Sequence, residues 1–300
     1  MKLFKKILLF FTFLFLIQGL YIFLAPQPMF RAQKIIFKYY LPPLQYILGL
    51  KAPDRTKPFF GFAFEKPEVL ISFKTKFSLD TIVANLTNDF EKSVQLMHWV
   101  RDQLPHKIPA IDINPQSFNS EDFLKNPQVD GMLCGQTSQI LIQALISMGI
   151  PARRVELRFT PKDAHAVVEV WSDFYQKWII LDPDYDIYYT LEDIPLNALE
   201  LHNLWVTEDY GNLVVYSRES PHNIYENNLK NSSIKLLNYY SHLSYPLRND
   251  WTSRPLSWWH PEGNHVQNSL VIEVEGMVDY EDFLLKTKDP KILYANPKTQ

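Results

Sequence analysis

The only cysteine of this 300-residue chain, Cys134, directly precedes an amphipathic helical pattern. Apolar residues recur at positions 140, 141, 144, 145 and 148, which predicts one buried stripe on a helix. Gly149 and Pro151 mark the end of this helix. The pattern therefore places Cys134 in the first helical turn. There, free backbone N–H groups and the positive end of the helix dipole favour a thiolate and could hold a developing oxyanion.

Alternating segments typical of β-strands follow the helix. They cover residues 154–159, 165–171 and 178–182. If the last two pair as a hairpin with Trp171 opposite Trp178, Val167 falls opposite Asp182 and His165 becomes a diagonal neighbour of Asp182. A slip of one residue would put His165 and Asp182 on opposite faces, so this prediction depends on the register.

The order Cys134, His165, Asp182 suits nucleophilic catalysis. A thiol is mostly protonated at neutral pH and needs an imidazole or a helix N-terminus to activate it, and a carboxylate can orient that imidazole. Each residue also has a simpler interpretation. A lone cysteine at a helix start is usually a small buried hydrophobe, and an aspartate before Pro183 is often a turn former.

Four sequence blocks in this order resemble the transglutaminase-like superfamily, in its bacterial membrane-anchored form. They are residues 131–135 (GMLCG), 149–153 (GIPAR), 164–171 (AHAVVEVW) and 178–183 (WIILDP). The resemblance covers about residues 85 to 190. It implies a papain-like thiol enzyme with Cys134 as nucleophile, His165 as general base and acid, and Asp182 as the group that orients His165. Because family members include transamidases, peptidases, amidases and inert relatives, the resemblance indicates a site more closely than a substrate.

Several other residues compete for roles in this site. Asp163, Asp184 and Asp186 are rivals for the orienting role. They rank below Asp182 because Asp163 precedes its strand and the other two follow the Asp-Pro step of the family. An oxyanion donor could come from Trp99, as in some relatives, although core packing is the alternative. Two glutamines have weaker claims to that role, Gln116 and Gln136.

The N-terminus predicts a membrane anchor. Three early lysines precede an uncharged run, Ile7 to Leu24, which as a helix spans about 27 Å and just crosses a bilayer core. A cleaved signal peptide is the alternative. The run exceeds the roughly 7–15 residues of a signal core, and residues 24–28 offer no clear cleavage site, which favours an uncleaved anchor. The very short N-terminus favours a cytoplasmic start and a catalytic domain on the periplasmic side, although basic residues beyond the run match the leading lysines in number.

We expect four parts along the chain. They are an anchor or signal peptide (1–25), a juxtamembrane segment and linker (26–60), a transglutaminase-like catalytic domain (61–200) and an aromatic-rich C-terminal extension packed on the core (201–300). Tyr239, Tyr240, Tyr245 and residues 248–251 and 258–265 gather aromatic, amide and charged side chains that suit a sugar or peptide, although they could equally fill gaps over the core. His260, Glu262 and His265 could in principle bind a metal, but no helical spacing fixes them.

Composition excludes several function classes. With 30 basic and 33 acidic residues the chain has no electrostatic footprint for nucleic acid, and 46% hydrophobic residues argue against disorder. One cysteine forbids an intramolecular disulfide. No Gly-rich phosphate loop or paired-cysteine zinc motif occurs, so we expect no cofactor and no catalytic metal.

The sequence thus predicts an α+β, papain-like core in which the Cys134 helix packs on an antiparallel sheet carrying His165 and Asp182, preceded by one transmembrane helix. The expected activity is cleavage or transfer of an amide or peptide acyl group, with a peptide, a protein or an amide-containing envelope component as substrate. The alternative is an inert membrane-tethered binding or scaffold module, for example in cell-envelope polysaccharide assembly. The oligomeric state and the exact substrate stay open.

Overall fold

The computed structural model describes residues 63–108, 119–160, 163–218, 222–223, 236–246, 248–249, 269–277 and 285–297. The predicted anchor and linker, Gln116 and residues 250–265 of the predicted aromatic cluster lie outside these residues. Among the helices of the described ranges, none has the length and apolar character needed to cross a membrane.

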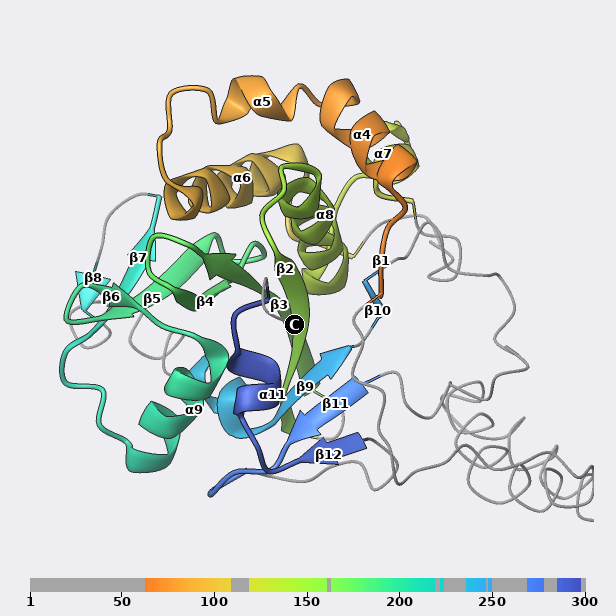
Figure 1. The fold of residues 1–300 in the computed structure, drawn as a ribbon. Helices are drawn as coiled ribbons and strands as arrows, with labels where there is room; N and C mark the ends of the chain where they lie inside the picture. The colour runs from red at the N-terminus through yellow and green to blue at the C-terminus, as the bar shows by residue number, and fades with distance from the viewer. Residues whose placement is uncertain are drawn as a thin grey trace, which may run out of the picture. The chain divides into compact units, whose positions relative to one another are not determined.

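Five helices lie together on one side of the molecule (Figure 1). They are α4 (Pro67–Lys76), α5 (Leu79–Ile82), α6 (Asp89–Gln103), α7 (Ser120–Lys125) and α8 (Cys134–Ser147). Helix α6 begins after Asn88, whose side chain accepts a hydrogen bond from the Glu91 N–H, as expected of an N-cap. Helix α8 begins at the cysteine, which confirms the predicted helix start.

The main sheet has six strands in the order β12-β11-β9-β2-β3-β4. The strands are β2 (Ala152–Thr160), β3 (Asp163–Ser172), β4 (Lys177–Leu181), β9 (Leu243–Pro246), β11 (Ser269–Ile272) and β12 (Leu285–Thr287). All neighbours are antiparallel except β11 and β12, which run parallel. The sheet is therefore mixed, whereas the sequence predicted an antiparallel one. A parallel neighbour requires a longer connection than a hairpin turn.

The β3–β4 hairpin has the predicted register, with Trp171 paired to Trp178 and Val168 to Leu181. The two indole rings meet edge to face with centroids 5.9 Å apart. Asp182 follows directly after β4, so this register brings it alongside the start of β3, where His165 lies.

A second, four-stranded sheet has the order β6-β5-β7-β8. It consists of β5 (Ile187–Leu191), β6 (Ile194–Pro195), β7 (Leu213–Ser217) and β8 (His222–Asn223). Shorter elements accompany the two sheets: α9 (Ala198–Thr207), the 3-10 helix η2 (Asn238–Ser241), α11 (Lys291–Tyr294), and the parallel pair of β1 (Ala63–Phe64) with β10 (Arg248–Asn249).

The main sheet separates two hydrophobic cores because alternate residues of a strand face opposite sides. Val168 and Leu181 pack into the core that contains α4, α6 and α8. Val167 and Ile180 pack into the core that contains β5, β7, α9, η2 and α11. The described residues thus form the α+β structure that the sequence predicted, and the helices lie on both sides of the sheet.

A buried ion pair joins two interior strands of the main sheet to the C-terminal segment. The Arg153 guanidinium donates two hydrogen bonds to one Glu169 carboxylate oxygen, at 3.0 and 2.6 Å, and one to the Leu293 carbonyl. The other Glu169 oxygen accepts from the Ala198 N–H at 2.9 Å and the Tyr294 hydroxyl at 3.0 Å. Because these partners come from α9 and α11, the pair ties both helices to β2 and β3.

Candidate functional site

Cys134 is the first residue of α8 and is half-buried. The Gln136 side-chain oxygen accepts the Leu133 N–H at 3.0 Å, and the Leu133 carbonyl accepts the N–H groups of Gln136 and Thr137. The N–H groups of Cys134 and Gly135, the first two residues of the helix, have no acceptor within it. The helix start therefore presents the thiol beside backbone N–H donors.

A buried hydrogen bond sets α8 against β3. The Ser138 hydroxyl donates to the Ala166 carbonyl at 2.9 Å. Ser138 lies one helical turn after Cys134, and Ala166 follows His165. This bond therefore connects the two elements within one turn of the thiol and one residue of the imidazole.

His165 and Asp182 are directly paired. The His165 Nε2 lies 2.7 Å from the Asp182 Oδ2, and both side chains are buried. The other Asp182 oxygen, Oδ1, accepts the N–H groups of Asp184 at 3.0 Å and Tyr185 at 3.2 Å. Two backbone hydrogen bonds between Asp182 and Ile187 close the turn, so the carboxylate is held at a fixed angle to the ring.

The thiol lies on the other side of the His165 ring. The Cys134 sulfur, a His165 ring nitrogen and an Asp184 carboxylate oxygen all lie within 4.8 Å of one another. Because Nε2 is bound to Asp182, Nδ1 is the nitrogen left to face the thiol, with which the ring also forms a hydrogen bond. The structure thus brings together the three residues that the sequence singled out.

The surroundings of His165 favour its charged form. Burial lowers the pKa of this imidazole, but the charge and hydrogen bond of Asp182 and the neighbouring Cys134 outweigh burial and raise the pKa to about 10. The ring therefore keeps its proton at neutral pH, which suits a group that must protonate a leaving amine.

A second carboxylate adjoins the thiol. Asp184 is 1% exposed at its side chain, and its Oδ1 lies 2.6 Å from the Nδ1 of His106. Burial raises the pKa of Asp184, although the hydrogen bond with His106 opposes this effect. The sequence favoured Asp182 over Asp184 as the group that orients His165. In the structure Asp184 pairs with His106 and not with His165.

Asp186, the third aspartate of this turn, also pairs with a histidine. The Asp186 Oδ1 lies 2.6 Å from the Nδ1 of His98, and its Oδ2 lies 3.1 Å from Arg218. Asp163, the remaining rival, accepts the Tyr239 hydroxyl at 2.7 Å. Each rival aspartate therefore has its own partner, and Asp182 is the one bound to His165.

A close backbone approach places His106. The Lys107 N–H donates to the Met132 carbonyl at 3.1 Å, and the Met132 N–H donates to the Pro105 carbonyl at 2.9 Å. A Cβ atom at Gly131 would lie 2.7 Å from the Lys107 carbonyl oxygen, so this position needs glycine. The glycine before the cysteine thus lets the His106 segment run alongside residues 131–132.

Two tyrosines lie against the His165 imidazole. The ring centroids of Tyr185 and Tyr239 lie 5.4 and 5.7 Å from that of His165. Tyr185 is 48% exposed and also stacks on His106. An exposed aromatic face beside the thiol offers a substrate an apolar surface.

Among the oxyanion candidates, Trp99 packs against Phe73 and Phe77, with ring centroids 6.3 and 5.5 Å away, and belongs to the helical core. Gln136 uses its side-chain oxygen to cap α8. The backbone N–H groups at the helix start are left as the best-placed donors.

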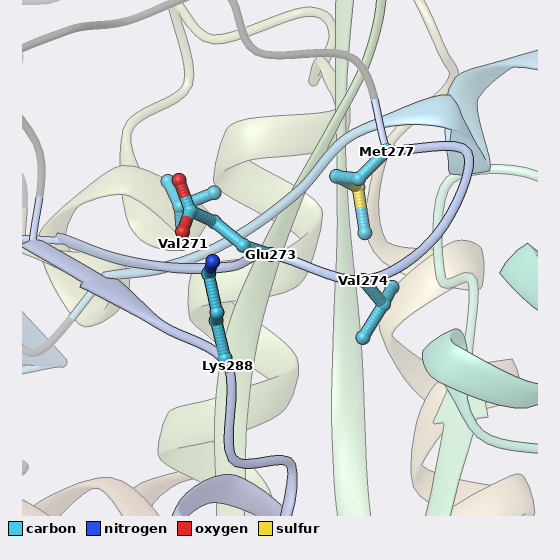
Figure 2. A pocket seen from close by; sticks show the side chains of 5 residues that line it. All are labelled: Val271, Glu273, Val274, Met277 and Lys288. Carbon is cyan, nitrogen blue, oxygen red and sulfur yellow. The ribbon is translucent and has the colours of Figure 1, made fainter.

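A separate pocket lies at the far end of the main sheet, lined by Val271, Glu273, Val274, Met277 and Lys288 (Figure 2). It contains none of the Cys134, His165 and Asp182 group. We therefore assign the candidate active site to the start of α8.

Comparison with known proteins gives a match for part of the chain. Residues 78–183 match the transglutaminase-like superfamily, so this segment carries a transglutaminase-like core with the Cys-His-Asp group inside it. No curated protein is similar enough to the chain to be matched.

Two solved structures are also similar. A provisionally assigned cysteine protease of Cytophaga hutchinsonii is 16% identical, with a TM-score of 0.32, over 46% of this chain and 44% of its own. A provisionally assigned protease of Parabacteroides distasonis is 15% identical, with a TM-score of 0.28, over 52% of this chain and 30% of its own. The similarity thus spans less than half the length of either structure.

Sequence analysis missed His106, His98 and the two tyrosines beside His165. Aspartates at alternate positions, 182, 184 and 186, directly after a strand indicated that each could bind a different partner. No local pattern in the sequence assigned histidines to them, because His98 and His106 come from α6 and the loop after it.

Proposed function

We propose that this protein is a cysteine-dependent acyl hydrolase or transferase that acts on an amide or peptide through a thioester on Cys134. The observation that carries the proposal is the position of the His165 ring, with Nε2 bound to Asp182 and Nδ1 facing the thiol. Burial of the imidazole and carboxylate keeps this geometry away from bulk water.

In the acylation step, the Cys134 thiolate attacks the amide carbonyl carbon and the sulfur–carbon bond forms. The carbonyl oxygen becomes an oxyanion, which the Cys134 and Gly135 N–H groups can stabilise at the helix start. The carbon–nitrogen bond then breaks, and the proton on Nδ1 of His165 moves to the leaving amine. Asp182 keeps the imidazole oriented and stabilises its charged form.

In the second step, water or another amine attacks the thioester carbon. His165, now neutral, accepts the proton of the attacking group, the carbon–sulfur bond breaks, and the thiolate–imidazolium pair returns. Each proton that His165 gives up in acylation is therefore recovered in deacylation.

We propose hydrolysis over cross-linking. A transamidase must keep water from the thioester until an amine arrives, which calls for a closed apolar channel over the sulfur. The residues that flank Cys134 in the sequence are mainly small or polar, including Gly131, Gly135, Thr137 and Ser138. The test is product partition from an acylated enzyme with a primary amine at millimolar concentration. Predominant free acid supports hydrolysis, and predominant amine adduct contradicts it.

The decisive experiment for catalysis is labelling of Cys134 by an electrophilic, thiol-directed probe in wild type and His165→Ala. We expect labelling to fall at least about tenfold in His165→Ala, because the thiolate loses its imidazolium partner. His98→Ala is the matched control, since His98 lies 2.6 Å from its carboxylate, close to the 2.7 Å of His165, but pairs with Asp186. Equal labelling of wild type and His165→Ala would contradict the proposal.

We also propose that residues 7–24 tether this domain to a membrane, with the active site on the periplasmic side and a peptide, protein or amide-containing envelope component as substrate. The lysine-led apolar run supports this. A C-terminal reporter that works only in the cytoplasm should stay inactive. A mature chain that starts near residue 26 would contradict the anchor.

The second candidate function is a catalytically inert, membrane-tethered binding module, which some members of this superfamily exemplify. The intact pairing of His165 with Asp182 argues against it, since a scaffold has no need of an oriented imidazole beside a thiol. Absence of probe labelling in a folded wild-type protein would favour it.

A further inference from the structure

The thiol, the imidazole and the buried Asp184 together offer a donor set for a divalent metal ion. One sulfur, one nitrogen and one carboxylate oxygen lie within 4.8 Å of one another. In a tetrahedral Zn²⁺ site with bonds of about 2.0–2.3 Å, neighbouring ligand atoms are about 3.3–3.8 Å apart. The three side chains thus need to approach by only about 1 Å to surround an ion.

The potential ligands have the hydrogen-bond partners that are typical of metal sites. Ligating histidines usually bind a carboxylate through their second ring nitrogen. Here the His165 Nε2 is already bound to Asp182 at 2.7 Å, which leaves Nδ1 for an ion. The Asp184 Oδ1 is bound to His106 at 2.6 Å, which leaves Oδ2 for an ion. Both potential ligands are therefore oriented by an outer partner.

We propose that Zn²⁺ binds to the Cys134 Sγ, the His165 Nδ1 and an Asp184 carboxylate oxygen, and that it reversibly blocks the nucleophile. Three protein ligands leave a fourth position for water at the half-buried thiol. Because the resting site holds a thiolate–imidazolium pair, binding releases the Nδ1 proton to solvent. The metal site stands on the ligand geometry alone, whereas the blocking effect rests on the proposed function.

Asp184 distinguishes this site from the triad. Asp182 completes the triad, and Asp184 is a separate buried acid that the acyl-transfer steps do not use. A carboxylate beside a thiolate is unfavourable by charge repulsion, and a divalent cation between them turns that repulsion into attraction. The arrangement accordingly suits a cation between Asp184 and the thiolate.

The test is titration of the chelator-treated full-length protein with Co²⁺, which reports its ligands by absorption. A thiolate-to-cobalt charge-transfer band and tetrahedral ligand-field bands should appear and should vanish when Zn²⁺ is added. Cys134→Ser should remove the charge-transfer band. No such band in wild type, or a band that persists in Cys134→Ser, would overturn the proposal.

Matched variants test the carboxylate. Asp184→Asn and His106→Gln should each weaken Co²⁺ affinity by about tenfold or more. Asp186→Asn and His98→Gln each break the equivalent Asp186–His98 pair, two residues further along the turn. These variants should keep a Co²⁺ affinity within about twofold of wild type. His106→Gln keeps Asp184 and so reports even if Asp184→Asn does not fold. Equal affinity in wild type and His106→Gln, with His98→Gln unchanged, would exclude Asp184 as an oriented ligand.

The two proposals fail in different ways. Zn²⁺ should slow alkylation of Cys134 by iodoacetamide, and a chelator should restore it. A protein that gives the cobalt spectrum and this protection but cleaves no amide would retain the metal site and lose the proposed function. A protein that hydrolyses amides but does not give the cobalt spectrum would retain the proposed function and lose the metal site.

Discussion

The Nε2 of His165 lies 2.7 Å from the Oδ2 of Asp182, and this contact joins the start of β3 to the residue after β4. The hairpin pairing of Trp171 with Trp178 sets this contact, because any other register would move Asp182 away from His165. The candidate active site is thus built from an ordinary antiparallel hairpin and the first turn of one helix.

The protein should stay active up to an unusually high pH, and the pH at which activity is lost should depend on Asp182. The protonated His165 donates to the leaving amine, and Asp182 helps raise its pKa to about 10, so kcat/KM should decline as the pH rises through about 10. In Asp182→Asn the alkaline limb should shift to lower pH, and kcat should fall by about 10²–10⁴-fold. The measurement is the pH profile of kcat/KM on a model amide. An unchanged alkaline limb in Asp182→Asn would contradict the assigned role.

Stability should fall with pH between about 6.5 and 10. In the folded protein the pKa of His165 is about 10 against an ordinary 6.5, so the folded state retains a proton that the unfolded chain releases. The stabilisation is complete below pH 6.5 and is lost as the pH rises through 10. Urea unfolding of wild type and His165→Gln at several pH values checks this. Parallel pH dependences of the two proteins would refute the prediction.

Loss of the Ser138 hydroxyl should loosen α8 from β3. Ser138→Ala removes the buried 2.9 Å hydrogen bond to the Ala166 carbonyl, and we expect about 1 kcal/mol less unfolding free energy and slower probe labelling of Cys134. Ser147→Ala is the control, because that hydroxyl donates only to the Gln143 carbonyl within α8. Equal effects of the two substitutions would argue against a positioning role for Ser138.

Breaking the buried ion pair should be costly. Arg153→Met leaves the Glu169 carboxylate, which is fully buried, without its cation, and we expect about 3–5 kcal/mol less unfolding free energy. Lys177→Met removes the Lys177–Glu200 pair, whose side chains are 20% and 39% exposed, and should cost less than about 1 kcal/mol. Chemical unfolding of both variants measures the difference, and comparable losses would contradict the prediction.

The sequence predicted what depends on neighbours along the chain. Helix α8, the β3–β4 hairpin and the contact of His165 with Asp182 follow from local periodicity and one turn, and the structure confirms them. The placement of β9 beside β2 could not be predicted, because Leu243 pairs with Leu157 across a long stretch of chain and the short strand has no distinctive pattern. The histidine partners of Asp184 and Asp186 were hidden for the same reason.

The turn from Asp182 to Asp186 binds three histidines from three parts of the chain, and the Asp182–Ile187 hydrogen bonds close it into one unit. A displacement of this backbone would disturb all three pairs together. Substitutions of Asp182, Asp184 and Asp186 should therefore be non-additive, so that a double variant loses less stability than the sum of its single variants. A change at one of these acids therefore alters what the other two can tolerate.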